Sequence, residues 1–340
     1  MTAPAEPLAP RLPDYLPGAC WTVGGGLRFD RGVQTIASFL GKISGAALDR
    51  VQAVAPCAWS LDWYVQRRPL AYSDICEAFE AYARMGMGVV LVFDNPWIPQ
   101  ESMADPYGLS LVQELYKRDR IRKNAVCVAS DALAEQLRAA CPHLPIYCHE
   151  NRLVAEQGRR SPRLYNSLLT RYRRITLHPA DAARPAILSA LEDPARIDIV
   201  VNDSCLRTCP VRREHLQLLA ALRRSPYDTT LMAQRASLIA RTACMSPPPP
   251  GPPAQNASCN IPRSELAQLH AAGFRSYIIQ SQLFRNEMTL LWDILQCRLP
   301  HTPEQSNKMA LIANSAMAEF GKPAGDLPSG LRQFSFSNIE

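Results

Sequence analysis

The chain has 340 residues, which is too long for a simple binding module and suits one large α/β barrel or two smaller domains. A hydrophobic fraction of 47% against 20% charged residues excludes a largely disordered chain. The formal net charge of +6 is too small to indicate a nucleic-acid partner by itself.

Short apolar runs alternate with helical stretches along most of the sequence. The predicted strands are Val51–Ala55, Val89–Phe93, Ala125–Ala129, Pro145–Cys148, Ile175–Leu177, Ile197–Val201 and Ser276–Ile279. The predicted helices are Ser73–Met85, Asp131–Ala140, a region around Pro162–Tyr172, Ala182–Leu191, Val211–Leu222 and Ser264–Ala272. Because strand–helix alternation produces parallel strands with helical crossovers, we expect an α/β fold with a single irregular TIM-like barrel.

The barrel is expected over residues 18–300, between a disordered Pro-rich tail at residues 1–17 and a C-terminal extension at residues 301–340. The Gly24–Gly26 triplet lacks the spacing of a dinucleotide fingerprint and a Walker lysine, so it predicts a turn. Met245–Pro253 is Pro-rich and predicts a surface loop, with recognition by a protein partner as the alternative. No apolar run is long enough to span a bilayer, and the N-terminal residues lack a signal-peptide pattern, which favours a cytoplasmic location.

Polar residues follow nearly every predicted strand. Ligands of parallel α/β folds bind at the carboxyl ends of the strands, so this pattern predicts a polar pocket on one face of the barrel. Each residue taken alone is also a common helix cap or turn former. The residues concerned are Asp94–Trp97, Ser130–Asp131, His149–Asn151, His178, Asn202–Cys205 and Gln280–Gln282.

Four of these residues are predicted to be catalytic: His149, Glu150, His178 and Asn202. Imidazole titrates near neutrality and a carboxylate can orient it, so the histidines with Glu150 suit acid–base catalysis. A structural role for each histidine, and a non-haem metal site formed with the carboxylate, remain alternatives. The predicted substrate-binding residues are Asn95, Arg212, His215 and Gln280, and Arg212 and His215 suit an anionic group.

Eleven cysteines are unusual in a chain with no export signal, where disulfides are disfavoured. Cys205 and Cys209 form the densest pair. Because Pro210 suits the first helical position, Cys209 is predicted to be the N-cap, with a pKa lowered by the helix dipole. Such a pair is half of a zinc or iron–sulfur site, and Cys244 and Cys259 would complete it.

A redox-active dithiol and unrelated free cysteines are the alternatives for this pair. Five other cysteines are expected to act as small hydrophobes in strands or helices, and two near the first strands stay undecided. The five are Cys76, Cys127, Cys141, Cys148 and Cys297, and the two are Cys20 and Cys57.

Ile197–Leu219, followed by Ile261–Leu283, resembles the collagenase-like (U32-type) peptidase family. The resemblance is greater to a bacterial branch with the motif N-x-x-C-x-x-x-C-P-x-R-x-x-H, which Asn202–His215 matches. Val92–Pro96 and Asp105–Tyr107 match further patterns of that branch. The resemblance covers roughly residues 50–285, although only the Asn202–His215 core is specific.

The resemblance implies an irregular TIM-like barrel with a 4Fe–4S cluster on Cys205, Cys209, Cys244 and Cys259. Better understood members serve oxygen-independent hydroxylation of ubiquinone precursors or of RNA bases, and peptidase activity is the older attribution. A small or RNA-borne aromatic substrate is therefore expected. Paired cluster proteins occur in the family, which implies a heterodimer or homodimer.

The sequence departs from the family where a "KIEGR" strand end is replaced by Ile279–Leu283, without lysine, glutamate or arginine. This loss puts the family's substrate or chemistry in doubt. Besides the iron–sulfur enzyme, a zinc- or cysteine-dependent hydrolase and a non-catalytic accessory or scaffold protein remain alternatives. Lys117–Lys123 and Arg171–Arg174 would be partner-binding patches in the last case, and solvated helix faces otherwise.

Overall fold

The computed structural model describes residues 15–27, 30–44, 48–61, 70–119, 123–156, 160–202, 205–242 and 261–280, together with residues 294 and 297. The chain divides into two compact units. One comprises Met1–Gly18, Arg31–Ala47 and Leu283–Glu340, and its described part is mainly helix α1 (Asp30–Ser44). The other, Ala19–Asp30 with Leu48–Gln282, contains the barrel. The predicted tail at residues 1–14 and the Pro-rich loop at Met245–Pro253 lie outside the described residues.

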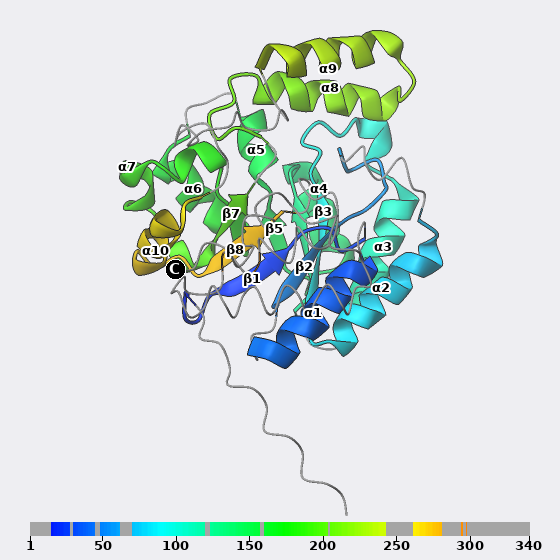
Figure 1. Ribbon diagram of the computed structural model, residues 1–340. Helices are drawn as coiled ribbons and strands as arrows, with labels where there is room; N and C mark the ends of the chain where they lie inside the picture. Colours follow the sequence, from blue (N-terminus) through cyan, green and yellow to red (C-terminus); the bar gives the residue numbers. More distant parts are fainter. Residues whose placement is uncertain are drawn as a thin grey trace, which may run out of the picture. The chain divides into compact units, whose positions relative to one another are not determined.

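Eight parallel strands of the second unit close into a barrel in chain order (Figure 1). They are β1 (Cys20–Val23), β2 (Arg50–Val54), β3 (Gly88–Phe93), β4 (Ala125–Val128), β5 (Ile146–Cys148), β6 (Arg174–Thr176), β7 (Ile197–Asn202) and β8 (Ser276–Ile279). Parallel pairing of β1 with β8 completes the ring. The predicted α/β class and TIM-like barrel are confirmed.

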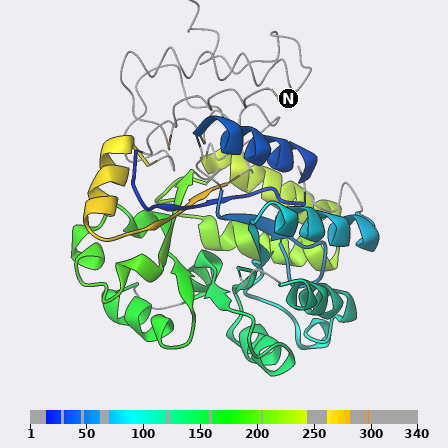
Figure 2. The ribbon, with the colours of Figure 1, turned by 90° about the horizontal axis from the view of Figure 1, so that it is seen from below.

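Helices connect the strands and surround them (Figure 2). They are α2 (Tyr72–Arg84), α3 (Pro106–Lys117), α4 (Asp131–Ala140), α5 (Glu150–Ala155), α6 (Pro162–Leu169), α7 (Pro185–Leu188), α8 (Arg212–Arg224), α9 (Thr229–Thr242) and α10 (Arg263–Ala271). Helices α8 and α9 lie side by side in both views (Figure 1, Figure 2). Within the described ranges, no helix combines the length and apolar character that a membrane span requires.

The two faces of the strands differ in chemistry. Residues that face the helices are large and apolar, such as Trp21, Phe93 and Tyr277, each at most 1% exposed. The guanidinium carbon of Arg50 on β2 lies 5.9 Å from the ring centroid of Tyr147 on β5. Because β2 and β5 are not neighbours in the barrel, both side chains point into its interior.

The predicted helix Ala182–Leu191 is wrong. That segment contains only the one-turn helix α7, and a 3-10 turn at Pro179–Asp181 precedes it. Pro185 has no N–H and disfavours helical backbone in the residue before it, so a helix cannot run through this point. The predicted turn at Gly24–Gly26 is confirmed, and Gly25 adopts a positive φ of 86°.

Candidate functional site at the carboxyl ends of the strands

All four predicted catalytic residues lie at the carboxyl ends of three neighbouring strands. His149 and Glu150 follow β5, His178 follows β6, and Asn202 is the last residue of β7. Their exposed fractions are 6%, 5%, 6% and 4%, respectively. Buried polar groups are costly unless they are hydrogen-bonded, so the partners of each side chain indicate its role.

His149 forms the corner between β5 and α5. Its Nδ1 atom accepts a hydrogen bond from the backbone N–H of Asn151 at 3.2 Å and thereby caps the helix. The neutral ring therefore carries its proton on Nε2. That atom lies 3.4 Å from Oε2 of Glu150, so the imidazole and the carboxylate face each other.

Glu150 is a buried carboxylate with an incomplete set of partners. Its Oε1 atom lies 4.0 Å from Nη2 of Arg212, beyond hydrogen-bond distance. Its Oε2 atom is fully buried and has no hydrogen-bond partner among the described residues. An unfilled acceptor on a buried charge is unfavourable. Glu150 is therefore suited to accept a hydrogen bond from a ligand.

His178 is held in the neutral form. Burial, and then the positive charges of Arg212 and Arg160, lower the pKa of His178 to about 2. Its Nδ1 atom accepts from the backbone N–H of Ala180 at 3.2 Å, so the proton lies on Nε2. At neutral pH His178 thus offers a hydrogen-bond donor and no charge.

The predicted substrate-binding residue Asn95 makes the contacts of a turn former. Its Oδ1 atom accepts from the N–H of Trp97 at 3.0 Å, and its Nδ2 atom donates to a backbone carbonyl at 3.4 Å. The adjacent Asp94 is buried, which raises its pKa. The Asn151 side chain donates to the carbonyl of Asp94 at 2.9 Å and joins the ends of β3 and β5.

Asn202 and Gln280 are bonded to each other across the ends of β7 and β8. Asn202 Oδ1 accepts from the N–H of Gln280 at 2.7 Å, and its Nδ2 donates to the Gln280 carbonyl at 3.3 Å. The strand register shifts between Val200 and Asn202. The amide of Asn202 therefore continues the hydrogen-bond ladder where the backbone leaves it.

Arg212 and His215, predicted to bind one anionic group together, have different partners. Arg212 begins α8, is 8% exposed and points toward Glu150. Nε of Arg235 on α9 donates to His215 Nε2 at 3.3 Å. Burial, and then the charges of Arg235 and Arg212, lower the pKa of His215 to about 4.

The thiols of Cys205 and Cys209 are hydrogen-bonded to each other, so the two side chains are in contact. The prediction of Cys209 as an N-cap is wrong, because α8 begins at Arg212 and its N-cap is Val211. The predicted lowering of the pKa is also wrong. Burial, and then the charge of Cys205, raise the pKa of Cys209, although the Val211 N–H donates to it.

The predicted ligands Cys244 and Cys259 lie outside the described residues. Within the described part of the chain, no group of three or more His, Cys, Asp or Glu residues is arranged to hold a metal ion. The alternative of a metal held by His149, Glu150 and His178 gains no support from the described residues and stays a prediction. Four cysteines are buried free thiols, which fits a packing role: Cys57, Cys127, Cys141 and Cys148.

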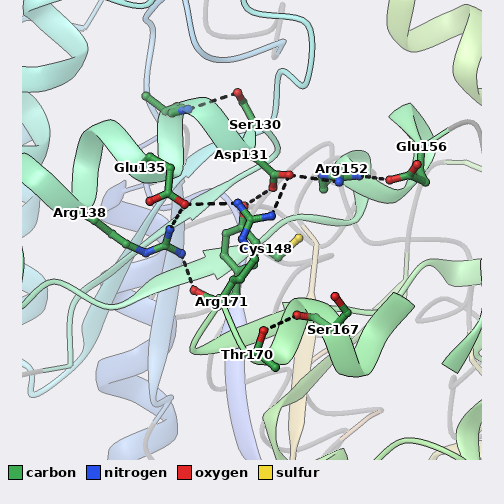
Figure 3. Close-up of polar contacts among 12 residues, drawn as sticks. Ser130, Asp131, Glu135, Arg138, Cys148, Arg152, Glu156, Ser167, Thr170 and Arg171 are labelled. Atoms are coloured by element: carbon green, nitrogen blue, oxygen red, sulfur yellow. Dashed lines mark hydrogen bonds and ion pairs between the residues drawn. The ribbon is translucent and has the colours of Figure 1, made fainter. Parts of the chain in front are cut away.

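Asp131 anchors the helix that carries Glu150, a role that sequence reasoning missed. Its carboxylate accepts from Arg152 of α5 and from Arg171, each at 3.2 Å (Figure 3). It also accepts from the Tyr172 hydroxyl at 2.6 Å. The neighbouring Ser130, and not Asp131, caps α4. The arginine-rich segment 171–174 was the available signal, because Arg171 is one of the donors to Asp131.

No family model and no curated protein matches the chain. Among the solved structures similar to it is a U32 peptidase with 14% sequence identity, covering 77% of this chain and 92% of that one with a TM-score of 0.47. Another, assigned as an alpha-L-fucosidase of Bacteroides thetaiotaomicron, has 10% identity over 71% of this chain and 97% of that one, with a TM-score of 0.35. Similarity at this level supports no statement about activity, and the barrel rests on the strand pairing described above.

Proposed function

We propose that the chain is an iron–sulfur-dependent barrel enzyme whose substrate binds at the carboxyl ends of the strands. The observation that carries the proposal is the contact between the thiols of Cys205 and Cys209, in the connection that follows β7. Two adjacent thiols fit half of a four-cysteine ligand set. Cys244 and Cys259 are proposed to complete it, as the family resemblance implies.

The same connection leads into Arg212, which faces Glu150. Cys205, Cys209 and the buried polar residues therefore belong to one end of the barrel. A bound cluster would supply electron transfer. Glu150 would accept a hydrogen bond from the substrate, Arg212 would supply positive charge, and neutral His178 would donate from Nε2. Oxygen-independent hydroxylation of a small or RNA-borne aromatic substrate is the finer proposal, and it rests on the Asn202–His215 resemblance.

The test is iron and acid-labile sulfide analysis of protein purified without oxygen. We expect brown protein with about four iron and four sulfide per chain. Cys205→Ser and Cys209→Ser should each lose most of both. Cys76→Ser is the matched control, because Cys76 is a half-buried cysteine of α2 far along the chain from the pair. It should retain full iron and sulfide content.

Two other results would overturn the proposal. About one zinc per chain without sulfide would identify a zinc site and favour a hydrolase. Folded, metal-free protein that co-purifies with a single partner would favour an accessory role, which the charge-free Ile279–Leu283 segment also suits.

A further inference from the structure

One side of the barrel interior is polar, although TIM barrels usually fill this space with branched apolar side chains. The side at β3 and β4 is apolar and contains Val90, Val92, Ala125 and Cys127. The polar residues of this side lie on the same inner face as Tyr147: Cys20, Thr22, Arg50, Arg174, Thr176, Asp198 and Ser276. The strand register shows this through the pairs Tyr147–Arg174, Thr176–Asp198, Asp198–Ser276, Cys20–Ser276 and Thr22–Arg50. Such a set of buried polar groups requires partners.

One of the two inward arginines has an ionic partner. Nε of Arg174 donates to Oδ1 of Asp198 at 2.7 Å, and its Nη2 donates to the carbonyl of Ala195 at 3.0 Å. The side chains of this pair are 15% and 8% exposed. The carboxylate of Asp198 is thus already used by Arg174.

Arg50, the other inward arginine, has no carboxylate within ion-pair distance among the described residues. Its Nη1 donates to the thiol sulfur of Cys20 at 3.3 Å, and its Nε is buried with no hydrogen-bond partner. The preceding Asp49 accepts instead from the backbone N–H of Trp21 at 2.7 Å. Burial raises the pKa of Cys20 to about 11, so the thiol is neutral and does not balance the guanidinium charge.

A second unused donor lies on the same side of the barrel interior as this arginine. Ser276 is 1% exposed, and its hydroxyl is buried with no hydrogen-bond partner in the described structure. It is paired in register with Cys20, the residue that Arg50 contacts. A guanidinium without a counterion and a free hydroxyl donor therefore share one side of the barrel interior.

We propose that this part of the barrel binds a small monovalent anion of the halide class, with Arg50 supplying the charge and Ser276 a hydrogen bond. Arg50 is half-buried with a fully buried Nε, and one anion would satisfy both this donor and the Ser276 hydroxyl. Chloride is the abundant ion with this chemistry. The site is separate from the carboxyl-end residues and does not depend on the proposed cluster.

The direct test is crystallisation of the full chain in bromide, followed by anomalous diffraction. We expect an anomalous peak within about 3.5 Å of Arg50 Nε. Thermal unfolding in potassium chloride against potassium gluconate at equal ionic strength is the solution test. Selective binding to the folded state should raise Tm in chloride by about 3 °C.

Arg50→Met should abolish the chloride-specific rise in Tm, whereas Arg50→Lys should keep part of it. Arg163→Met, at an exposed arginine of α6, removes the same charge outside the barrel and should leave the rise unchanged. A water molecule in place of the bromide peak in the wild-type crystal would overturn the proposal. So would an equal chloride effect in wild type and Arg50→Met. The crystallographic test holds even if an Arg50 variant fails to fold.

Discussion

The two ends of the barrel contain the same types of charged residue in different states of pairing. In the amino-terminal half, Arg174 and Asp198 are joined by a 2.7 Å hydrogen bond. At the carboxyl ends, Arg212 and Glu150 are 4.0 Å apart, and one carboxylate oxygen is buried without a hydrogen bond. A closed pair holds the strands together, whereas an open pair keeps an acceptor for a ligand. Whether the two charged side chains are hydrogen-bonded to each other, and not which residue types they are, therefore distinguishes a stabilising pair from a ligand-binding one.

Breaking the closed pair should have the largest effect on stability. Asp198→Leu leaves Arg174 with a largely buried charge and no carboxylate, which should lower the free energy of unfolding by about 3 kcal/mol. The double variant Arg174→Met/Asp198→Leu should recover most of this loss, because it removes both charges. Urea unfolding measures both values. A single variant as stable as wild type would contradict the closed-pair interpretation.

Substitutions of Asn202 test whether this residue, the last of β7, has a structural or a catalytic role. Asn202→Ala removes the acceptor of the Gln280 N–H and should lower the free energy of unfolding by about 2 kcal/mol. Asn202→Asp retains the acceptor and should recover part of the loss. If chemical unfolding finds both variants as stable as wild type, the amide has a role other than joining β7 to β8.

His178 should make stability fall as the solution becomes acidic. Its pKa in the folded protein is about 2, below the ordinary value of 6.5. Below pH 6.5 the unfolded chain therefore binds a proton at His178, whereas the folded protein does not. The stability lost from this group between pH 7 and pH 5 should be about 2 kcal/mol. His178→Asn keeps an acceptor for the Ala180 N–H and should weaken the pH dependence. Urea unfolding of wild type and His178→Asn at pH 7 and pH 5 measures this difference. An equal change in the free energy of unfolding with pH in both proteins would contradict a buried neutral imidazole.

The strands of the barrel were predictable because continuous apolar runs such as Val89–Phe93 are typical of strands buried on both faces. β1 was not predicted, since Cys20–Val23 is too short and mixed to stand out. Helix α9 was missed for a related reason. A helix that buries little has no strong apolar repeat in its sequence, and Leu238 is the one buried residue of α9 in the described structure.

The location of the candidate site was predictable, whereas the role of each side chain was not. Parallel strands bring His149, Glu150 and His178 to one end of the barrel whatever the details of the fold. The role of Asn202 depends on a register shift between β7 and β8, which no local pattern encodes. The environment of Cys209 depends on where α8 begins, and proline alone did not locate that residue.

The smallest change in stability, and the sharpest test of the open pair, is expected for Glu150→Gln. The substitution keeps the shape of the side chain and removes a buried charge whose Oε2 has no hydrogen bond, so the free energy of unfolding should rise by up to about 1 kcal/mol. Glu77→Gln, at an exposed position of α2, should leave stability unchanged. A fall of about 2 kcal/mol or more in Glu150→Gln alone would show that Glu150 and Arg212 form a stabilising ion pair. A rise would mean that the folded protein retains an unfavourable carboxylate, which is the expected property of a group that binds a ligand.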